Sequence, residues 1–406
     1  MMTRKGYRFL LKPTAEQAEL FCRFAGSSRF VWNKALECQK SCLKNGKGVF
    51  SYAEICGRLV EWKDEFHFLK EVHSQPLQQS VKDLSLALKH CFDGSKGFPK
   101  FKKKGDHDTF RFPQGTKLDN KKVYLPKIGW VKFRKSQEIE GTIKNVTVTR
   151  SMGNWFVSIQ VEMDVQDPMH PSKNEVGIDM GVTRFATLSD GSFVAPINSF
   201  GQVRSKLAGA LRKLARKQKY SNNWRKQKRK VQRIHSKIAH VRKDFLHKLT
   251  SSISKNHAVI VLEDLKVKNM SASAKGTIED PGKNVKAKSG LNRSILDQGW
   301  HEFRRQLEYK QQWRGGQVIL VNPSHTSLQC SECHHRAKEN RVSQAEFKCV
   351  MCHHEEHADL NAAKNILAAG APCKPVEILS RMLLKPRNLP SFRAERTSTK
   401  SPCLHG

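Results

Sequence analysis

The spacing of apolar and polar residues changes several times along the chain, and each change predicts a different kind of element. Gly6 to Leu11 has the character of a short strand, and Thr14 and Gln17 then have the spacing of a capping box at a helix start. Helical spacing continues past a Gly/Lys loop at 45–48 and ends at the segment GFPKFKKKG. We therefore expect a strand followed by a helical region.

A pattern typical of β structure covers 109–162. Polar residues alternate there with apolar ones such as Val157, Ile159 and Val161, on both sides of a turn with the sequence Met-Gly-Asn at 152–154. This pattern predicts a β hairpin within a small barrel.

The next region mixes strands and helices. GIDMGVTRFATLSDG predicts two strands of a hairpin, HAVIVLEDL a short buried parallel strand, and 317–321 another strand. Within 204–248 apolar residues recur every three or four positions, which predicts two antiparallel helices, interrupted at 220–224. We expect further helices at about 294–313 and at DLNAAKNILAA.

Two segments lack such spacing. The stretch 266–292 is rich in Gly, Lys and Ser, and we expect a mobile loop there. Residues 373–406 have no clear period, which predicts a disordered basic tail.

The charge of the chain narrows the class of partner. Lys and Arg number 73 against 37 Asp and Glu, which gives a formal net charge of +36 and a pI near 10.0. This excess is larger than solubility requires and indicates a polyanion, namely nucleic acid. The region 204–248 alone holds 17 Lys/Arg and one acid, so we expect it to lie along phosphates. The chain has no apolar run of about 18 residues, which is the length that a membrane span requires. We therefore expect no membrane partner and an intracellular location.

The cysteines predict one metal site. Of eleven, four form two close pairs, Cys330-x-x-Cys333 and Cys349-x-x-Cys352, with fifteen residues between the pairs. This is the spacing of a four-cysteine zinc ribbon, in which four thiolates close the coordination of one structural zinc ion. Each pair is followed by His, at a position where knuckles usually have Gly because φ is positive, and His tolerates that region better than most residues.

Three carboxylates are the candidates for chemistry. Asp179 is expected mid-strand between two glycines, Glu263 at the end of an apolar strand, and Asp359 at a helix start. Any one of them alone is more often a cap or a solvated acid. Together, in so basic a chain, they match phosphodiester hydrolysis, in which oxygen ligands hold two Mg²⁺ ions about 3.5 to 4 Å apart.

The ordered blocks GIDMGVTRFATLSDG, VIVLEDL, LNRSILDQGWHEFRRQLEYK, TSLQCSEC and DLNAAKNIL resemble those of the TnpB family, transposon-encoded relatives of the type V CRISPR nucleases. The resemblance covers about Gly6 to Leu367. It implies a RuvC-like, RNase H-type nuclease whose catalytic, magnesium-binding residues are Asp179, Glu263 and Asp359. Family members often have a second acid two residues before the last Asp, and this chain has His357 there.

The same resemblance implies the partners and the fold class, which is α/β plus β-barrel in several domains. The partners are a guide RNA from the transposon end and double-stranded DNA with a short adjacent motif. The protein is expected to bind them as a monomer. Its expected location is the prokaryotic cytoplasm, and the nucleoid when it is bound to DNA. The expected domains are a split wedge-type barrel at 1–12 and 105–168, a helical recognition domain at 13–104, a RuvC-like nuclease at 172–324 and 357–372, and a zinc-ribbon insertion at 325–356.

Further residues are candidates for nucleic-acid contact. Gln amides pair with adenine edges, and the candidate readers of the adjacent motif are Tyr52, Lys70, Gln78 and Gln79. On the basic helices the candidates for phosphate contact are Arg212, Lys213, Arg216, Lys226, Arg229 and Lys230. The loop at 266–292 directly follows Glu263, and we expect it to act as a lid that admits the single strand.

Three alternatives to an RNA-guided endonuclease remain. A nuclease-inactive RNA-guided repressor requires the loss of a carboxylate, and none is lost. A DNA-joining transposase shares the order Asp, Glu, Asp, but the cysteine pairs inserted before the last Asp argue against it. A zinc-ribbon DNA-binding accessory explains the cysteines and leaves the carboxylates unexplained.

Overall fold

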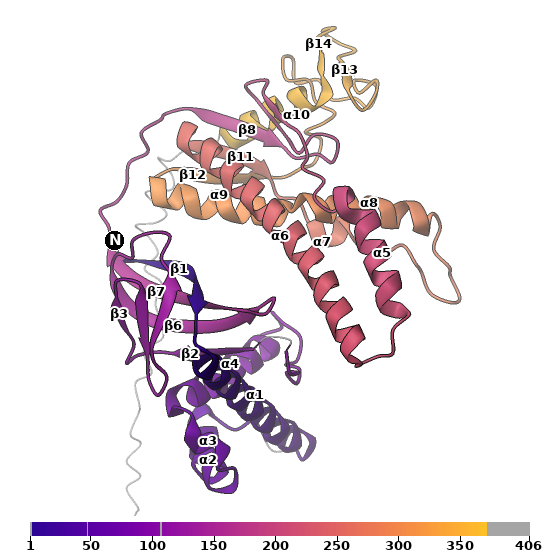
Figure 1. The fold of residues 1–406 in the computed structure, drawn as a ribbon. Coiled ribbons are helices and arrows are strands. Elements are labelled where there is room, and N and C mark those ends of the chain that lie inside the picture. The colour runs from indigo at the N-terminus through magenta and orange to yellow at the C-terminus, as the bar shows by residue number, and fades with distance from the viewer. Residues whose placement is uncertain (1, 47, 106–107, 372–406) are drawn as a thin grey trace, which may run out of the picture. The chain divides into compact units, whose positions relative to one another are not determined.

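The computed structural model describes residues 2–46, 48–105 and 108–371, and these form two compact units (Figure 1). Unit 1 contains 2–168 and 207–236, and unit 2 contains 169–206 and 237–371. The basic tail predicted at 373–406 lies outside the described residues. No helix among the described residues combines the length and the apolar character that crossing a membrane requires.

A seven-stranded antiparallel sheet forms the framework of unit 1. Its order is β2-β6-β7-β1-β5-β4-β3, so β2 and β3 lie at opposite ends and the sheet is a half-barrel, whereas the sequence predicted a barrel. The predicted hairpin is β6–β7, whose turn places Met152 and Gly153 at φ 53° and 85°. The strands are β1 (Met2–Lys12), β2 (Thr109–Phe112), β3 (Lys117–Asp119), β4 (Lys122–Leu125), β5 (Gly129–Arg134), β6 (Thr142–Ser151) and β7 (Asn154–Asp164).

Strand β1 is longer than the sequence pattern predicted. Its first residues are mostly polar and show no alternation of polar and apolar side chains. They nevertheless pair with β7, beginning with Met2 opposite Asp164, so backbone hydrogen bonds extend the strand there. Strand β1 lies between β7 and β5 in the sheet.

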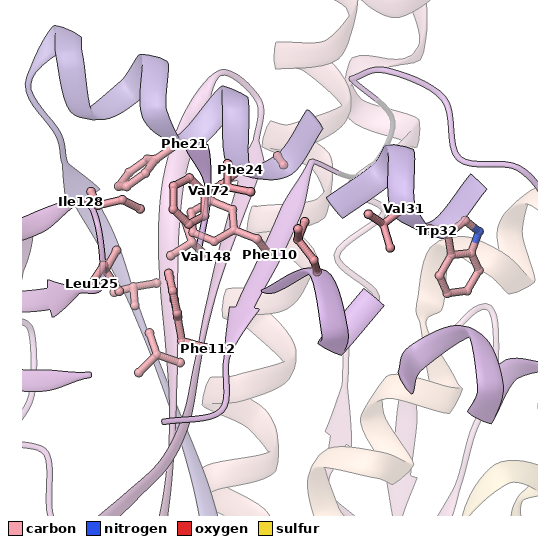
Figure 2. Close-up of a cluster of buried hydrophobic side chains, with 14 of the residues drawn as sticks. Phe21, Phe24, Val31, Trp32, Val72, Phe110, Phe112, Leu125, Ile128 and Val148 are labelled. Carbon is pink, nitrogen blue, oxygen red and sulfur yellow. The ribbon is translucent and has the colours of Figure 1, made fainter. Parts of the chain in front are cut away.

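Helices cover one face of this sheet. The capping box predicted at Thr14 is present at the start of α1, and the helices are α1 (Ala15–Lys44), α2 (Tyr52–Glu65), α3 (Phe68–Glu71) and α4 (Ser74–Phe92). Figure 2 shows Phe21 and Phe24 of α1 beside Phe110 and Phe112 of β2. The rings of Phe21 and Phe110 are 5.7 Å apart between centroids, within the range of favourable aromatic contacts.

A five-stranded sheet of order β10-β9-β8-β11-β12 organises unit 2. Strands β8, β11 and β12 are parallel, while β9 and β10 continue the sheet antiparallel, as the sequence predicted for the hairpin and the buried strand. Their bounds are β8 (Glu175–Asp179), β9 (Ala186–Leu188), β10 (Phe193–Val194), β11 (Val259–Glu263) and β12 (Gln317–Val321). A two-stranded sheet, β13 (Glu346–Lys348) and β14 (Glu355–His357), follows in the cysteine region.

The basic region forms two helices, as predicted. They are α5 (Arg204–Ala215), preceded by the 3-10 turn η1 (Gly201–Val203), and α6 (Asn222–Asn256), which begins in unit 1 and continues into unit 2. The amide of Gln227 on α6 donates to the Ala210 carbonyl oxygen on α5 at 2.9 Å.

Two predictions for 266–314 are wrong. The expected loop contains α7 (Val267–Met270) and the first half of α8 (Val285–Gln298), and the single helix expected at 294–313 is instead α8 followed by α9 (Trp300–Arg314). Gly299 separates the two helices at φ 77°, a conformation that stops a helix and that Gly adopts without strain. Gly and Lys in the first half of α8 hid its start from the sequence pattern.

The last helix, α10 (Ala358–Gly370), packs directly on the parallel strands. A Cβ on Gly177 of β8 would lie 2.2 Å from the Ala363 carbonyl oxygen and 2.6 Å from the Leu367 nitrogen. A Cβ on Gly370 would lie 2.6 Å from a methyl carbon of Val261 on β11. Both glycines therefore set how closely α10 approaches the sheet.

This close approach predicts a large effect of one methyl group. Gly177→Ala should destabilise the protein by about 1–3 kcal/mol, because the atoms it meets are backbone atoms that move only with the whole helix. Thermal unfolding measures the change. Gly209→Ala is the matched control, since a Cβ there meets nothing within 4 Å and Ala favours the interior of α5. Equal melting temperatures for Gly177→Ala and the wild type would contradict the packing argument.

Candidate active site

Asp179 and Glu263 end two neighbouring parallel strands. Asp179 is the last residue of β8 and Glu263 is the last of β11, and the register pairs the residues immediately before them. The prediction that Asp179 lies mid-strand is therefore wrong. The chain then passes through Gly181, where a Cβ would lie 2.8 Å from the Arg184 carbonyl oxygen, so a larger residue does not fit there.

Both carboxylates emerge on the face of the sheet that α10 covers. Side chains two residues apart on a strand share a face. Asp179 therefore shares the face of Gly177, and Glu263 shares the face of Val261, and both of these strand residues meet α10. Val176, Ile178 and Met180 point to the opposite, buried side, as the sequence predicted.

Asp359 reaches the same edge from the helix. It lies in the first turn of α10, and its backbone amide donates to Nδ1 of the N-cap residue His357 at 3.2 Å. A carboxylate in a first helical turn interacts favourably with the positive end of the helix dipole. The structure therefore brings together the three carboxylates that the sequence singled out, from two strands and one helix.

Asp179 lies close enough to Glu263 and Asp359 for their charges to affect its pKa. Burial, followed by the negative charges of Glu263 and Asp359, raises the pKa of Asp179 to about 7, and the positive charge of Arg341 partly opposes this. Burial also raises the pKa of Glu263, against a hydrogen bond that Thr326 Oγ1 donates to Glu263 Oε1 at 2.6 Å. Both carboxyl groups are therefore protonated more readily than a fully solvated carboxyl group.

Arg341 is a residue of this site that the sequence analysis missed. It lies between the two cysteine pairs, and its guanidinium donates to the Gln344 carbonyl oxygen at 3.2 Å. The Gln344 amide in turn donates to Thr183 Oγ1 at 3.2 Å, in the turn that follows β8. In a chain with 73 Lys and Arg, one further arginine carries no signal of its own, so only the fold identifies it.

The four paired cysteines form a compact cluster. Their sulfur atoms all lie within 4.8 Å of one another, with Cys330–Cys352 at 3.7 Å and Cys333–Cys349 at 3.5 Å. Four sulfurs about 2.3 Å from a central zinc would be separated by about 3.8 Å, so the spacing fits a tetrahedral ion. In the part of the chain that the structure describes, the carboxylate oxygens of Asp179, Glu263 and Asp359 do not all lie within 4.8 Å of one another, so they are more widely spaced than the sulfurs.

The two cysteine pairs have the same backbone geometry. His334 and His353 adopt φ 60° and 58°, which confirms the positive φ expected after each pair. The Cys330 amide donates to the His335 carbonyl oxygen and the Cys349 amide to the His354 carbonyl oxygen, each at 2.9 Å. This repetition produces two knuckles that face each other.

The cysteine segment is tied directly to α10. The Asn361 side chain accepts from the Ser331 amide at 2.8 Å and donates to the Gln329 carbonyl oxygen at 2.7 Å. Asn365, one turn further, donates to the Thr326 carbonyl oxygen at 3.0 Å. The start of α10, and with it Asp359, is thereby fixed to the segment that carries the cysteines.

The other candidates lie at the surface of unit 1. Tyr52 is 40% exposed at the start of α2, Lys70 pairs with Asp64 at 2.8 Å, and Gln78 is exposed. Gln79 is half-buried and lines a cavity of about 30 Å³ that Lys102 also lines. The six basic candidates on or beside α5 and α6 are all exposed: Arg212, Lys213, Arg216, Lys226, Arg229 and Lys230.

Three family models match separate parts of the chain. The model described as "Probable transposase" matches 158–274, "Cas12f1-like, TNB domain" matches 300–366, and "Helix-turn-helix domain" matches 1–48. In the structure the residues of the last match form β1 and α1, one strand and one helix.

Two relatives match along most of their length. The "Putative RNA-guided DNA endonuclease InsQ" of Escherichia coli (strain K12) is 54% identical over 374 residues, which are 91% of this chain and 93% of that protein. A "Putative RNA-guided DNA endonuclease" of Streptomyces pristinaespiralis is 33% identical, over 90% of this chain and 89% of that protein. Among solved structures, the Cas12f1-sgRNA-target DNA complex matches 87% of this chain and 83% of that one, with a TM-score of 0.52 and 16% identity, so it supports the fold alone.

The raised pKa of Asp179 predicts a pH-dependent cost to folding. Its unfolded-state pKa of 3.8 rises to about 7 in the folded protein, so the penalty is absent below about pH 4 and grows until the pH passes about 7. Without added magnesium, Asp179→Asn should melt above the wild type at pH 8, and the two should converge near pH 4.

Glu302 is the control, because its pKa is shifted in the opposite direction to that of Asp179. The hydrogen bond with Arg305 lowers its pKa to about 2, so Glu302→Gln should lose stability at pH 8. Melting curves of both variants across pH 4–8 measure the two effects. A wild type that gains stability relative to Asp179→Asn as the pH rises would contradict the assignment.

The cysteine cluster predicts one tightly held metal ion. Elemental analysis should find about one zinc per chain. Cys349→Ser should lose that zinc and lower the melting temperature, because the segment that fixes the start of α10 loses its centre. Cys22→Ser, at an exposed position outside the cluster, should retain the zinc. Unchanged zinc content in Cys349→Ser would contradict the site.

Proposed function

The chain belongs to the TnpB family, and we propose that it is an RNA-guided DNA endonuclease encoded by a transposable element. It hydrolyses phosphodiester bonds of target DNA next to a short adjacent motif, at a single RuvC-like site. The observation that carries the proposal is the convergence of Asp179, Glu263 and Asp359 on one edge of a parallel sheet. The sequence supports the proposal through its similarity, along most of the chain, to two relatives named as putative RNA-guided DNA endonucleases.

The three carboxylates suit divalent cations with oxygen ligands. Burial, followed by the negative charges of Glu263 and Asp359, raises the pKa of Asp179, and a hard cation such as Mg²⁺ would neutralise those negative charges. We propose that Asp179, Glu263 and Asp359 hold two Mg²⁺ ions. When bound, such ions supply activation of water and stabilisation of the leaving oxygen.

The surrounding side chains position the reacting groups. Thr326 donates a hydrogen bond to Glu263 and so fixes one carboxylate oxygen, leaving the other free to bind. Arg341 carries a positive charge close enough to Asp179 to affect its pKa, and a guanidinium binds phosphate oxygens in a bidentate way. We assign Arg341 to the scissile phosphate, which it would hold beside the carboxylates.

Zinc has a separate, structural role in this proposal. Four thiolates leave it no open coordination position, so it takes no part in the reaction. Its function is to hold the segment 325–356 in a shape that anchors α10, through Asn361 and Asn365. For the other domains we propose the bounds that the sequence predicted: a wedge at 1–12 and 105–168, recognition helices at 13–104, and the nuclease at 172–324 and 357–372.

The nucleic-acid contacts remain proposals about residues at the surface of unit 1. Tyr52, Lys70, Gln78 and Gln79 are proposed to face the adjacent-motif duplex, and the exposed cations of α5 and α6 to lie along phosphates. The guide RNA reads the target sequence by base pairing, while protein contacts of this kind read backbone and shape.

A nuclease-inactive repressor and a DNA-joining transposase are the alternative functions. The intact carboxylate set argues against the first, and the full-length relatives named as endonucleases argue against the second. A repressor would bind the matched DNA with its RNA and leave it uncut. A transposase would join DNA ends without any RNA.

The deciding experiment purifies the protein with its RNA and offers plasmids that carry a guide match beside randomised flanking sequence. The wild type should cut only matched plasmids, and only with magnesium. Asp179→Ala should abolish cutting while RNA and target binding persist, and Arg341→Ala should slow it by about 10² or more, as loss of a charge-stabilising donor does. Arg341→Lys should restore part of that rate.

Glu61→Ala is the matched control, because Glu61 is an exposed acid on α2, outside the proposed site. It should cut like the wild type. Guide-dependent cutting that survives Asp179→Ala would overturn the active-site assignment, and a wild type without bound RNA would overturn the guided mechanism.

A further inference from the structure

The residue that caps α10 is an unusual choice for a helix start. Helix N-caps are most often Ser, Thr, Asp or Asn, whose side-chain oxygen accepts a hydrogen bond from an amide of the first turn. In this chain His357 has that position, with extended backbone at φ −63° and ψ 128°, and its Nδ1 accepts from the Asp359 amide at 3.2 Å. A ring nitrogen therefore replaces the usual oxygen at the helix start that carries Asp359.

This hydrogen bond specifies the form of the imidazole ring. Nδ1 accepts a hydrogen bond only when it carries no proton, so the ring is neutral and its single N–H is at Nε2. The same Nδ1 of His357 lies 3.9 Å from Asp359 Oδ2. A carboxylate at the N-cap would therefore place a negative charge next to a group that already carries one.

The two acids that precede His357 are both paired with lysines. Glu355 pairs with Lys348 and Glu356 pairs with Lys364, each at 2.5 Å. Within the described part of the chain, no Lys or Arg pairs with Asp359. Of the three acids in this short segment, only Asp359 therefore contributes an unpaired charge.

The charge at position 357 is important because of the carboxylates around it. Burial, followed by the negative charges of Glu263 and Asp359, raises the pKa of Asp179 to about 7. A further carboxylate at 357 would add to this repulsion, because like charges interact strongly where little water screens them. A neutral cap fixes the start of α10 without that cost.

We propose that His357 is a positioning residue for the three carboxylates. Its ring fixes the first turn of α10, and thereby Asp359, and it adds no fourth negative charge to Asp179, Glu263 and Asp359. This inference rests on the proposed function for the presence of Mg²⁺. Because cation affinity depends on the number of charged ligands, the neutral cap makes Mg²⁺ binding weaker than an acidic cap would.

Three substitutions in the full-length protein without RNA separate the cap from the charge. Asn and Asp cap helices about equally well, so His357→Asn and His357→Asp differ mainly in charge. Without metal at pH 8, His357→Asn should melt within about 1 °C of the wild type, and His357→Asp about 2–4 °C below His357→Asn. His357→Ala has no cap and should melt about 2–4 °C below the wild type.

The helix dipole sharpens the comparison of His357→Asp with His357→Asn. By itself the dipole favours a negative charge at a helix start, so it would stabilise the Asp variant. A lower melting temperature for His357→Asp therefore reports repulsion from the three carboxylates and not a poorer cap.

Magnesium should favour the acidic variant. When Mg²⁺ is titrated against melting temperature, the half-effect concentration for His357→Asp should be about tenfold below that for His357→Asn, because the ion gains one more negative neighbour. The wild type should match His357→Asn. A merely structural cap predicts one concentration for all three proteins.

His301→Asp is the matched control. His301 is exposed in the first turn of α9, which packs on the opposite face of the sheet from α10. The substitution adds the same charge at another helix start. It should change the Mg²⁺ concentration by less than about twofold, since charges far apart at a surface are screened.

The outcomes separate this inference from the proposed function. Equal melting temperatures for the wild type and His357→Ala would overturn the capping role. A metal-free His357→Asp protein that melts with or above His357→Asn would overturn the argument from charge, even when the wild type cuts guided targets. Equal Mg²⁺ concentrations for these two variants would overturn the inferred effect on magnesium. If Mg²⁺ alters no melting temperature, the proposed magnesium site fails, and the metal-free comparison still decides the role of His357.

Discussion

The close approach of α10 to β8 is the constraint on which the site depends. Gly177 has no side chain, so the helix backbone lies where a Cβ of any other residue would stand. The contact sets the distance between the helix start and the carboxyl ends of the strands. Asp359 belongs to the helix and Asp179 to the strand, so the separation of these two carboxylates follows from a packing distance rather than from any bond between them.

That packing brings negative charges together, and the fold compensates them only in part. Burial and the neighbouring carboxylates raise the pKa of Asp179 to about 7, while Arg341 and the hydrogen bond from Thr326 to Glu263 supply limited relief. The cysteine cluster differs, because backbone hydrogen bonds within each knuckle hold its sulfurs at ligand spacing. One site is preorganised by local structure, and the other by long-range packing.

Sequence pattern was reliable where a local interaction decides the structure. The capping box at Thr14, the helix break near 220 and the two histidines at positive φ all depend on residues close in the chain, and the structure has each of them. Pattern failed at Gly299 and in the half-barrel. A single Gly splits the helix there because of its left-handed φ, and sheet closure depends on strands far apart in sequence.

The sequence by itself determined the chemical inventory: a strongly basic chain, four cysteines at zinc-ribbon spacing, and three carboxylates in recognisable contexts. Only the tertiary structure decided which of these side chains meet. Asp179, Glu263 and Asp359 are separated by long stretches of chain. Arg341 belongs to the cysteine segment, whose fold brings its charge close enough to Asp179 to affect the pKa of that carboxyl group. Local spacing encodes local geometry, whereas proximity between distant residues follows from how buried surfaces pack.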